Sequence, residues 1–317
     1  MGVCQQMKKL LREKEYVLTF GIHNAMQAMI VERAGYDAVY MGGYDTTVSM
    51  LGLPDVGLIT ETEMVTNARY IAKSVQVPVV ADADNGYGNA INTIRTVQNY
   101  EAAGLAGIHI EDQVAPKRCG HLAGKTLIPL EEAVGKIRAA LDAKNDKDFL
   151  IIGRTDAIAA VGGGFDEALK RGKAFAKAGA DMVWSEFTSP ETEIPRRFAE
   201  EMHAEFPDVP LFFNYSGNFR WYESPAEFRE IAKLGYKFIN VSLGALRASA
   251  KAVWEYAVDL KAREAEAEID FEKKLIGHPL QKLTEFSGFS RIMEMESKYL
   301  PSDEVKMKYE QSVGLVK

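Results

Sequence analysis

The sequence has little cysteine, no long apolar segment and no excess of positive charge. Its two cysteines, Cys4 and Cys119, are too few for a disulfide framework, so a reducing compartment is the default. No segment approaches the roughly 18 uninterrupted apolar residues of a membrane span, and the first residues lack the apolar core of a signal peptide. The net charge of -7 argues against a general nucleic-acid surface. These absences predict a cytoplasmic protein that binds neither membranes nor nucleic acid.

What is present is a repeated alternation of short apolar segments and helical patterns. Several helical patterns end at a glycine just before the next apolar segment, as at Gly104 and Gly179, where helices commonly stop. Near-continuous apolar strands between helices indicate a parallel sheet that is covered on both faces. The eight predicted strands are residues 17–20, 37–41, 77–81, 106–110, 149–152, 181–184, 209–213 and 237–241.

Eight strand–helix units within roughly 250 residues match the size of a (β/α)8 barrel. The alternative, a doubly wound sheet, is disfavoured because no G-x-G-x-x-G follows the first strand. We therefore predict an α/β protein with a TIM-type barrel in residues 1–245 and a helical extension in 246–317. The extension opens with a long helical run, 245–269, and shorter helices are expected at 279–286 and 290–299. Its apolar side chains are expected to pack on a neighbouring subunit or on the chain's own barrel.

Residues suited to a functional site, polar ones and two glycines, directly follow seven of the predicted strands. In a barrel, the carboxyl ends of the strands converge on one mouth, where active sites lie. Such an arrangement predicts a single site for all of them. The residues are Gly42, Gly43, Asp82, Asp84, Glu111, Asp112, Arg154, Asp156, Glu186, Asn214, Ser216 and Ser242.

Three of these acids, Asp82, Asp84 and Glu111, have the composition of a hard-cation site. Asp82 and Asp84 are two apart on a strand, so their side chains share a face. Carboxylates without cysteine or histidine ligands suit Mg²⁺, with Mn²⁺ as a second possibility. The alternative is that these acids cap the following helices.

A long loop after the fourth strand carries Cys119 between two cations, Lys117 and Arg118, and an imidazole, His121. Nearby positive charge stabilises a thiolate, so a lowered pKa is expected for this cysteine. Gly120 lets the loop bend. The alternative is a basic surface loop that happens to hold a cysteine.

Arg154 is placed to bind a substrate carboxylate through two hydrogen bonds, the alternative being a salt bridge with Glu186 or Asp156 at the barrel rim. Asn214 and Ser216 are neutral groups fit for a second carboxylate. Tyr40, at a strand end, is either buried packing or a proton acceptor. His109 lies in the middle of a strand and is expected to be a core histidine.

A metal, carboxylate-binding groups and a thiol on a mobile loop suggest one reaction type. The metal polarises the oxygens of a 2-oxo or 2-hydroxy acid. A neighbouring C–C bond breaks, and Cys119 protonates the resulting carbanion as a general acid. The loop closes to exclude water while that carbanion exists.

The run Lys117-Arg118-Cys119-Gly120-His121 resembles the signature loop of isocitrate lyases and 2-methylisocitrate lyases, which belong to the phosphoenolpyruvate mutase superfamily. The similarity extends through residues 82–88, 111–113 and 154–156. The resemblance implies a β/α barrel, Mg²⁺ and a homotetramer whose C-terminal helices are swapped between neighbours.

By matching position, the resemblance implies that Asp82, Asp84 and Glu111 hold the metal and that Cys119 is the proton donor. The predicted catalytic residues are Cys119, His121, Tyr40 and Arg154. The predicted substrate-binding residues are Gly42, Gly43, Tyr44, Asp55, Lys117, Gly120, Arg154, Glu186, Asn214, Ser216 and Asn218.

Residues 180–191 and 213–221 resemble isocitrate lyase more than methylisocitrate lyase, so the leading expectation is cleavage of isocitrate to glyoxylate and succinate. Three residues depart from the isocitrate lyase pattern. Asn218 and Gly42 each replace a serine, and Tyr44 replaces a tryptophan. A 2-methylisocitrate or substituted-malate lyase, an oxaloacetate hydrolase and a non-catalytic carboxylate-binding barrel remain as alternatives.

Overall fold

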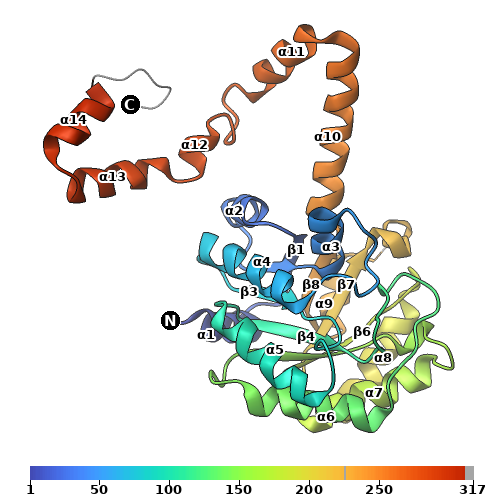
Figure 1. Ribbon diagram of the computed structural model, residues 1–317. Coiled ribbons are helices and arrows are strands. Elements are labelled where there is room, and N and C mark those ends of the chain that lie inside the picture. Colours follow the sequence, from blue (N-terminus) through green and yellow to red (C-terminus); the bar gives the residue numbers. More distant parts are fainter. Residues whose placement is uncertain (225, 311–317) are drawn as a thin grey trace. The chain divides into compact units, whose positions relative to one another are not determined.

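The computed structural model describes residues 1–224 and 226–310, and its centre is a closed barrel of eight parallel strands (Figure 1). The strands are β1 (Val17–Ile22), β2 (Val39–Met41), β3 (Val79–Asp82), β4 (Gly107–Glu111), β5 (Leu150–Thr155), β6 (Met182–Ser185), β7 (Leu211–Ser216) and β8 (Tyr236–Ser242). Each strand pairs with its sequence neighbours, and β1 closes the ring on β8 from Val17 against Phe238 to Phe20 against Val241. The predicted TIM-type (β/α)8 fold is confirmed.

Helix α1 (Val3–Glu13) precedes the first strand, and the helices between the later strands lie outside the barrel (Figure 1). They are α2 (Ala25–Arg33), α3 (Gly43–Leu51), α4 (Glu61–Ser74), α5 (Ala90–Ala102), α6 (Leu130–Ala143), α7 (Phe165–Ala178), α8 (Glu193–His203) and α9 (Phe228–Lys233). Helix α10 (Gly244–Arg263) follows β8. Four further helices follow: α11 (Ala265–Leu275), α12 (Leu283–Phe286), α13 (Phe289–Tyr299) and α14 (Ser302–Glu310).

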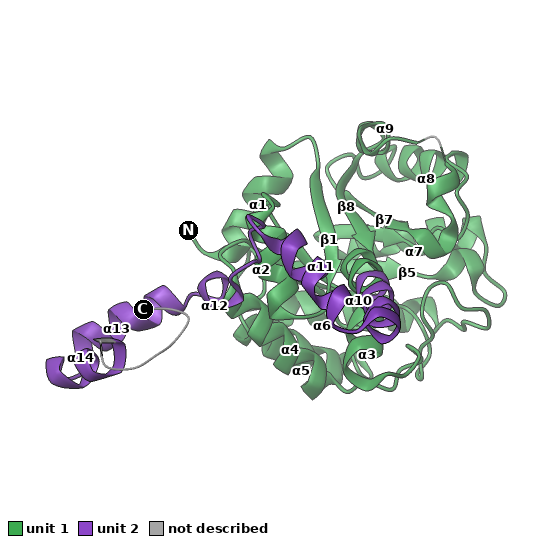
Figure 2. Cartoon of the chain, turned by 90° about the horizontal axis from the view of Figure 1, so that it is seen from above, with its two compact units in different colours: residues 1–249 green, residues 250–317 purple. Residues whose placement is uncertain are grey.

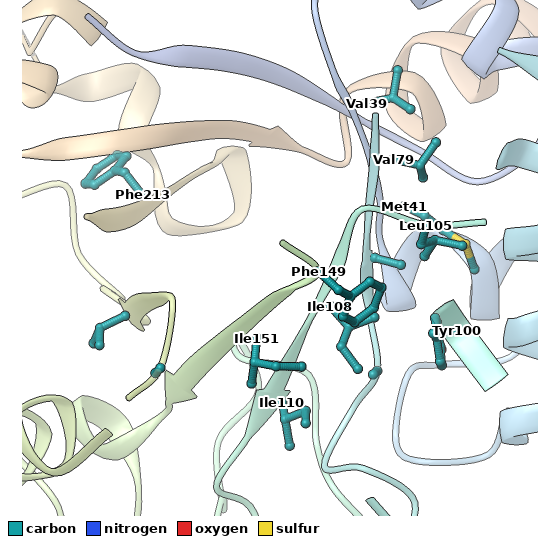
Figure 3. Close-up of a cluster of buried hydrophobic side chains, with 14 of the residues drawn as sticks. Val39, Met41, Val79, Tyr100, Leu105, Ile108, Ile110, Phe149, Ile151 and Phe213 are labelled. Atoms are coloured by element: carbon teal, nitrogen blue, oxygen red, sulfur yellow. The ribbon is translucent and has the colours of Figure 1, made fainter. Parts of the chain in front are cut away.

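Alternate residues of the strands feed two separate apolar clusters, as the two-residue period of a strand requires. Outward-facing side chains such as Val39, Val79 and Ile108 pack against the helices (Figure 3). Inward-facing side chains such as Trp184 and Phe212 fill the barrel, and Met7 of α1 packs with them. Because α1 covers the start of the strands, the mouth at their carboxyl ends is left for a site.

Two helical predictions are wrong in detail. The run expected to be one helix over 245–269 breaks at Glu264, whose φ of 49° cannot continue a right-handed helix. Helix α3 was not predicted, because Gly42-Gly43 suggests a loop, yet Gly42 is the residue that caps this helix. The expected helix start at Pro225 lies outside the described residues.

By its contacts the chain divides into two compact units, residues 1–249 and 250–317 (Figure 2). Helix α10 runs across this boundary and across the predicted one at 245/246. Within the second unit, Arg263 pairs with Asp259 at 2.7 Å and with Asp270 at 3.0 Å, which ties α10 to α11. In the described part of the chain, no helix is both long and apolar enough to span a membrane.

Candidate active site

A cavity opens at the carboxyl ends of the strands and gathers most of the residues that the sequence predicted. Five predicted residues do not line its wall: Asp84, Glu111, Asp112, Asp156 and Asn218. The predicted residues that do are Tyr40, Gly42, Gly43, Tyr44, Asp55, Asp82, Lys117, Cys119, Gly120, His121, Arg154, Glu186, Asn214, Ser216 and Ser242. Strand ends and the Cys119 loop therefore meet at one place, as a barrel mouth requires.

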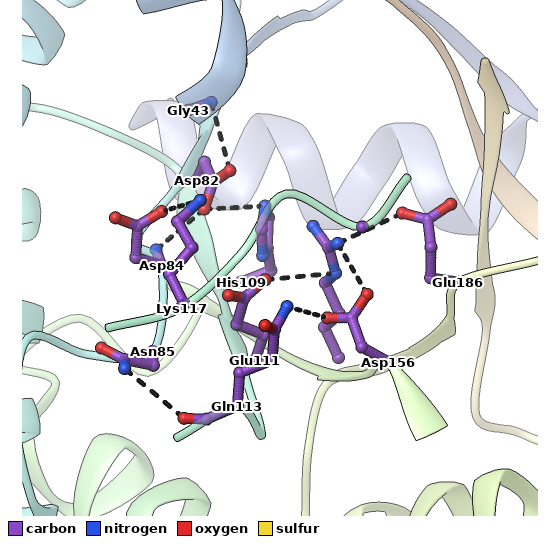
Figure 4. Close-up of polar contacts among 12 residues, drawn as sticks. Gly43, Asp82, Asp84, Asn85, His109, Glu111, Gln113, Lys117, Asp156 and Glu186 are labelled. Atoms are coloured by element: carbon purple, nitrogen blue, oxygen red, sulfur yellow. Dashed lines mark hydrogen bonds and ion pairs between the residues drawn. The ribbon is translucent and has the colours of Figure 1, made fainter. Parts of the chain in front are cut away.

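The carboxylates Asp55 and Asp84 are held by one buried cation. The Lys117 Nζ atom lies 2.8 Å from Asp55 Oδ2 and 2.7 Å from Asp84 Oδ1, and all three side chains are at most 4% exposed. Figure 4 shows Lys117 beside Asp84 and Asp82. Burial lowers the pKa of Lys117, but the two aspartates more than reverse this and raise it well above its ordinary value. Lys117 therefore stays charged and joins the Cys119 loop to the end of β3.

Arg154 of β5 is shared among three carboxylates. Its Nη2 atom lies 3.0 Å from Asp156 Oδ1 and 3.3 Å from Glu186 Oε2, and its Nε atom lies 3.6 Å from Glu111 Oε2. The guanidinium also lies 4.2 Å over the Trp184 ring. The alternative of a rim salt bridge is thus the observed state, and a substrate carboxylate would have to share or displace these partners (Figure 4).

Tyr40, His109 and Asp82 form a buried polar chain across the barrel mouth. The Tyr40 hydroxyl lies 2.6 Å from His109 Nε2, which lies 3.4 Å from Asp82 Oδ1. Burial lowers the pKa of His109 to about 4 and raises that of Tyr40 well above its ordinary value, so both are neutral near pH 7. His109 is buried as predicted, but its two partners are residues of the predicted site.

The three predicted metal ligands are engaged by different groups. Asp82 accepts a hydrogen bond from the Gly43 N–H at 3.1 Å, Asp84 pairs with Lys117 and Glu111 with Arg154. No group of three or more histidine, cysteine or acidic side chains in the described residues is arranged to hold a metal ion.

The donor chemistry nevertheless fits a hard cation. Glu111 Oε1 is buried and has no hydrogen-bond partner among the described residues, and burial raises the pKa of Glu111 well above its ordinary value despite Arg154. A buried carboxylate with an unpartnered oxygen is the kind of group that a divalent cation stabilises. Asp82, Asp84 and Glu111 therefore suit Mg²⁺ by composition and by this unmet demand for positive charge.

The expectation of a lowered pKa at Cys119 is wrong in this structure. Burial raises the pKa of the thiol, and the carboxylate of Asp55 adds to the effect. Lys117 lowers the pKa of the thiol, but burial outweighs this effect, and Arg118 instead donates to the Ala123 carbonyl at 3.4 Å. A neighbour in sequence need not be a neighbour in space. The Sγ atom lies 3.1 Å from His121 Nδ1 instead.

The Cys119 loop is fixed by side chains that bind its backbone. Gln113 Nε2 donates to the Arg118 carbonyl at 2.8 Å, and its Oε1 accepts from the Arg118 N–H at 2.9 Å. Lys125, 2% exposed, donates to the Gly120 carbonyl and, at 3.1 Å, to the Leu122 carbonyl. Between β4 and α6 the described chain has no helix or strand, so these bonds, together with the one at 3.1 Å from the Cys119 N–H to the Asp55 carbonyl, position Cys119.

The far wall of the cavity carries the residues expected to bind a second carboxylate. Asn214 Nδ2 donates to the two Glu186 oxygens at 3.1 and 3.2 Å. Ser216 Oγ accepts from the Asn218 N–H at 3.3 Å. The Asn218 side chain lies 3.3 Å from His121 Nδ1, so it contacts the predicted catalytic histidine although it does not line the cavity.

Several lining residues were missed by the sequence reasoning. Asp45 lies in the unpredicted helix α3, and Trp184 and Asn240 lie within predicted strands and line the cavity. The signal that was available is their position next to a strand end. The additional lining residues not predicted as site residues are Asp45, Trp184, Phe219, Asn240 and Leu243.

Comparison with known proteins agrees with this geometry. Residues 7–261 match the family model described as phosphoenolpyruvate phosphomutase. The chain belongs to the phosphoenolpyruvate mutase and isocitrate lyase superfamily. It is 40% identical over 313 residues to an isocitrate lyase of Haloferax volcanii, an alignment that covers 98% of this chain and 90% of the relative.

Two solved structures of the superfamily show the same architecture. A 2,3-dimethylmalate lyase superposes with a TM-score of 0.84 at 30% identity, covering 99% of both chains. A phosphonopyruvate hydrolase bound to oxalate and Mg²⁺ superposes with a TM-score of 0.81 at 28% identity, covering 95% of this chain and 100% of the other. The predicted superfamily and the predicted class, an oxo-acid lyase, are confirmed.

Proposed function

We propose that this superfamily member cleaves isocitrate to glyoxylate and succinate. The observation that supports this most is the placement of the Cys119 thiol and the strand-end carboxylate Asp82 on one cavity. The reaction needs a proton donor at one end of the substrate and a group that polarises its oxygens at the other. Cys119 is the candidate donor, and Asp82 is one of the residues that would hold the polarising cation. The similarity to the Haloferax isocitrate lyase along nearly the whole chain favours isocitrate among the possible acids.

In this reaction a base takes the proton of the substrate hydroxyl, and the hydroxyl oxygen becomes the aldehyde oxygen of glyoxylate. The bond between that carbon and its neighbour breaks, and the electron pair stays on the carbon beside a carboxylate. The Cys119 thiol donates its proton to this carbon, which completes succinate. Because burial raises its pKa, Cys119 holds the proton until the carbanion forms.

The other residues bind and orient the acid. Arg154 is the cation nearest to Glu186 in the wall, and its remaining N–H groups suit one substrate carboxylate. Ser216 and Asn214 are available to a second. Gly120 lets the loop backbone lie against Arg154, since a Cβ atom there would be 2.7 Å from Arg154 Nη2.

Asp82, Asp84 and Glu111 are the residues that would hold Mg²⁺, or Mn²⁺ in its place. When bound, the ion supplies Lewis-acid polarisation of the substrate oxygens. The protein contribution is to hold these carboxylates close together in a buried place, where Lys117 pairs with Asp84 and Arg154 with Glu111.

We also propose that residues 250–317 pack on a neighbouring subunit in a homotetramer. Of their described side chains only Ala267 and Phe286 are buried, whereas Trp254 is 73% and Ile276 is 71% exposed. Apolar exposure on this scale usually marks an interface. Light scattering of a chain that lacks residues 286–317 should show smaller assemblies; an unchanged tetramer would contradict the proposal.

The function is tested by offering isocitrate, 2-methylisocitrate and 2,3-dimethylmalate with Mg²⁺ and trapping the carbonyl product. Glyoxylate from isocitrate at the highest kcat/KM is the expected result. Cys119→Ser should lower kcat by roughly 10²–10⁴-fold. If pyruvate from one of the other two acids is the main product, that acid and not isocitrate is the substrate. If Cys119→Ser keeps full activity, Cys119 is not the proton donor.

A further inference from the structure

Asp45 occupies a place in the cavity wall that only a glycine neighbour permits. It lies in the first turn of α3 and is 1% exposed. Its carboxylate folds back over Gly42, so that a Cβ atom built on Gly42 would lie 2.2 Å from Asp45 Oδ2. The pair is therefore coupled: the missing side chain at Gly42 is the space that the carboxylate fills.

One oxygen of this carboxylate lacks a partner. Asp45 Oδ1 is buried and accepts no hydrogen bond within the described part of the chain. The site's two main cations are used elsewhere, Lys117 by Asp55 and Asp84 and Arg154 by the Glu186 side of the cavity. Because an unpartnered buried carboxylate oxygen is unfavourable, a donor from a bound molecule fits this position.

A second unpartnered atom lies in the wall of the same cavity. Asn240 Oδ1 accepts from the Thr19 hydroxyl at 3.2 Å, while Asn240 Nδ2 has no acceptor among the described residues. Asp45 and Asn240 both line the cavity and offer it a free acceptor and a free donor. A hydroxyl group both donates and accepts, whereas a carbonyl oxygen only accepts.

We propose that Asp45 is a specificity-determining residue that accepts a hydrogen bond from a substrate hydroxyl and thereby selects 2-hydroxy acids over 2-oxo acids. This rests on the proposed function for the site, but it concerns a residue and a choice that the function does not fix. A 2-oxo acid would place a carbonyl oxygen against a carboxylate, with Asp82 and Asp55 adding negative charge on the same wall. Sites built to hydrogen-bond a hydroxyl discriminate strongly against analogues that lack it.

The test measures the binding of malate and oxaloacetate by calorimetry with Mg²⁺ present. At the same carbon, malate carries a hydroxyl group and oxaloacetate a carbonyl group. The test is run at about pH 8.5, because burial raises the pKa of Asp45 to about 7 and the acceptor must be ionised. The natural chain should bind malate at least about 10-fold more tightly. Asp45→Asn, which offers an amide donor, should lower that ratio by about 10-fold.

Two further variants keep the result decisive. Asp142→Asn removes one charge from an exposed position near the end of α6 and should leave the ratio unchanged. Gly42→Ala keeps the charge of Asp45 but forces its carboxylate out of place, so it should lower the ratio as Asp45→Asn does. An unaltered ratio in both site variants, or no preference for malate in the natural chain, would overturn the proposal.

The binding ratio also separates this proposal from the proposed function. If Asp45→Asn lowers the binding ratio but the natural chain never releases glyoxylate from isocitrate, the role of Asp45 stands and isocitrate is not the substrate. If the natural chain cleaves isocitrate but Asp45→Asn leaves the malate-to-oxaloacetate ratio unchanged, the proposed function stands and the role of Asp45 is wrong.

Discussion

The strand-end carboxylates and the Cys119 loop are two halves of one site that are held in place by different means. Asp82 and Glu111 are the last residues of β3 and β4, so the register of the barrel fixes where they lie. The register places Asp82 opposite His109 and Glu111 opposite Arg154. Their geometry is a product of the fold itself, and any change that keeps the barrel keeps the acids close together.

The loop has no such support. Residues 113–129 contain no helix or strand, only an isolated bridge between Gln113 and Leu127. Its shape depends on a few buried side chains that donate to its carbonyls, Lys125 among them, and Arg171 donates to the Ile128 carbonyl at 3.0 Å. The proton donor is therefore positioned by individual hydrogen bonds, which single substitutions remove without unfolding the barrel.

Lys117 belongs to both halves, and its loss should have the largest effect. In Lys117→Met, the buried carboxylates of Asp55 and Asp84 lose their shared cation. Breaking a buried ion pair by removing one partner costs about 3–5 kcal/mol. We expect the free energy of unfolding in urea, measured without added metal, to fall by about that amount.

The matched control is Lys147→Met, which removes an exposed lysine from the turn before β5 and should change stability by no more than about 0.5 kcal/mol. Adding Mg²⁺ should recover part of the loss in Lys117→Met, because a bound cation replaces the missing charge. Equal stability of the two variants would show that the aspartates do not depend on Lys117.

Gly120 is where the two halves touch, and its substitution should have an intermediate effect. In Gly120→Ala, the new Cβ atom would lie 2.7 Å from Arg154 Nη2 and 3.2 Å from Asp156 Oδ1, so the loop must move away. A displacement of about 1 Å at a catalytic group costs up to roughly 10²-fold in rate. We expect kcat to fall by about 10–100-fold while the melting temperature changes little.

Gly135→Ala is the control for this substitution. Gly135 lies within α6, and a Cβ atom there would meet nothing within 4 Å. Because alanine suits a helix better than glycine, this variant should be more stable by about 0.5–1 kcal/mol and fully active. A Gly120→Ala enzyme with unchanged kcat would mean that the loop position seen here is not the catalytic one.

The same contrast explains what the sequence could and could not predict. The eight strands were predictable because their apolar runs and the glycines before them are local signals. The position of acids such as Asp82 and Glu111 follows because residues at the carboxyl ends of barrel strands lie at the mouth. The sequence also resembles its superfamily strongly at the Cys119 loop. Most predicted site residues accordingly line one cavity.

What failed depends on contacts between distant segments. The pKa of Cys119 was misjudged because the fold buries the thiol and brings Asp55 close to it, and these two effects outweigh the charge of Lys117, which itself binds Asp55, 62 residues away in the chain. Asp45 was missed because Gly42-Gly43 suggests a loop, whereas the chain starts helix α3 there. A sequence shows which charges are present, but their pairing is decided by the fold.

The smallest effect is expected where a single loop contact is removed and the barrel is untouched. In Lys125→Met, the Gly120 and Leu122 carbonyls lose a buried donor, which costs about 1–3 kcal/mol of loop stability. We expect faster hydrogen exchange of amides in residues 118–124, a fall in kcat/KM of about 10-fold and an unchanged urea midpoint for the barrel. Lys125→Arg keeps a donor and should recover part of the protection. If exchange rises equally in the loop and in β4, the loop does not open independently of the barrel. The division of the site into a half fixed by the fold and a half fixed by individual hydrogen bonds is then wrong.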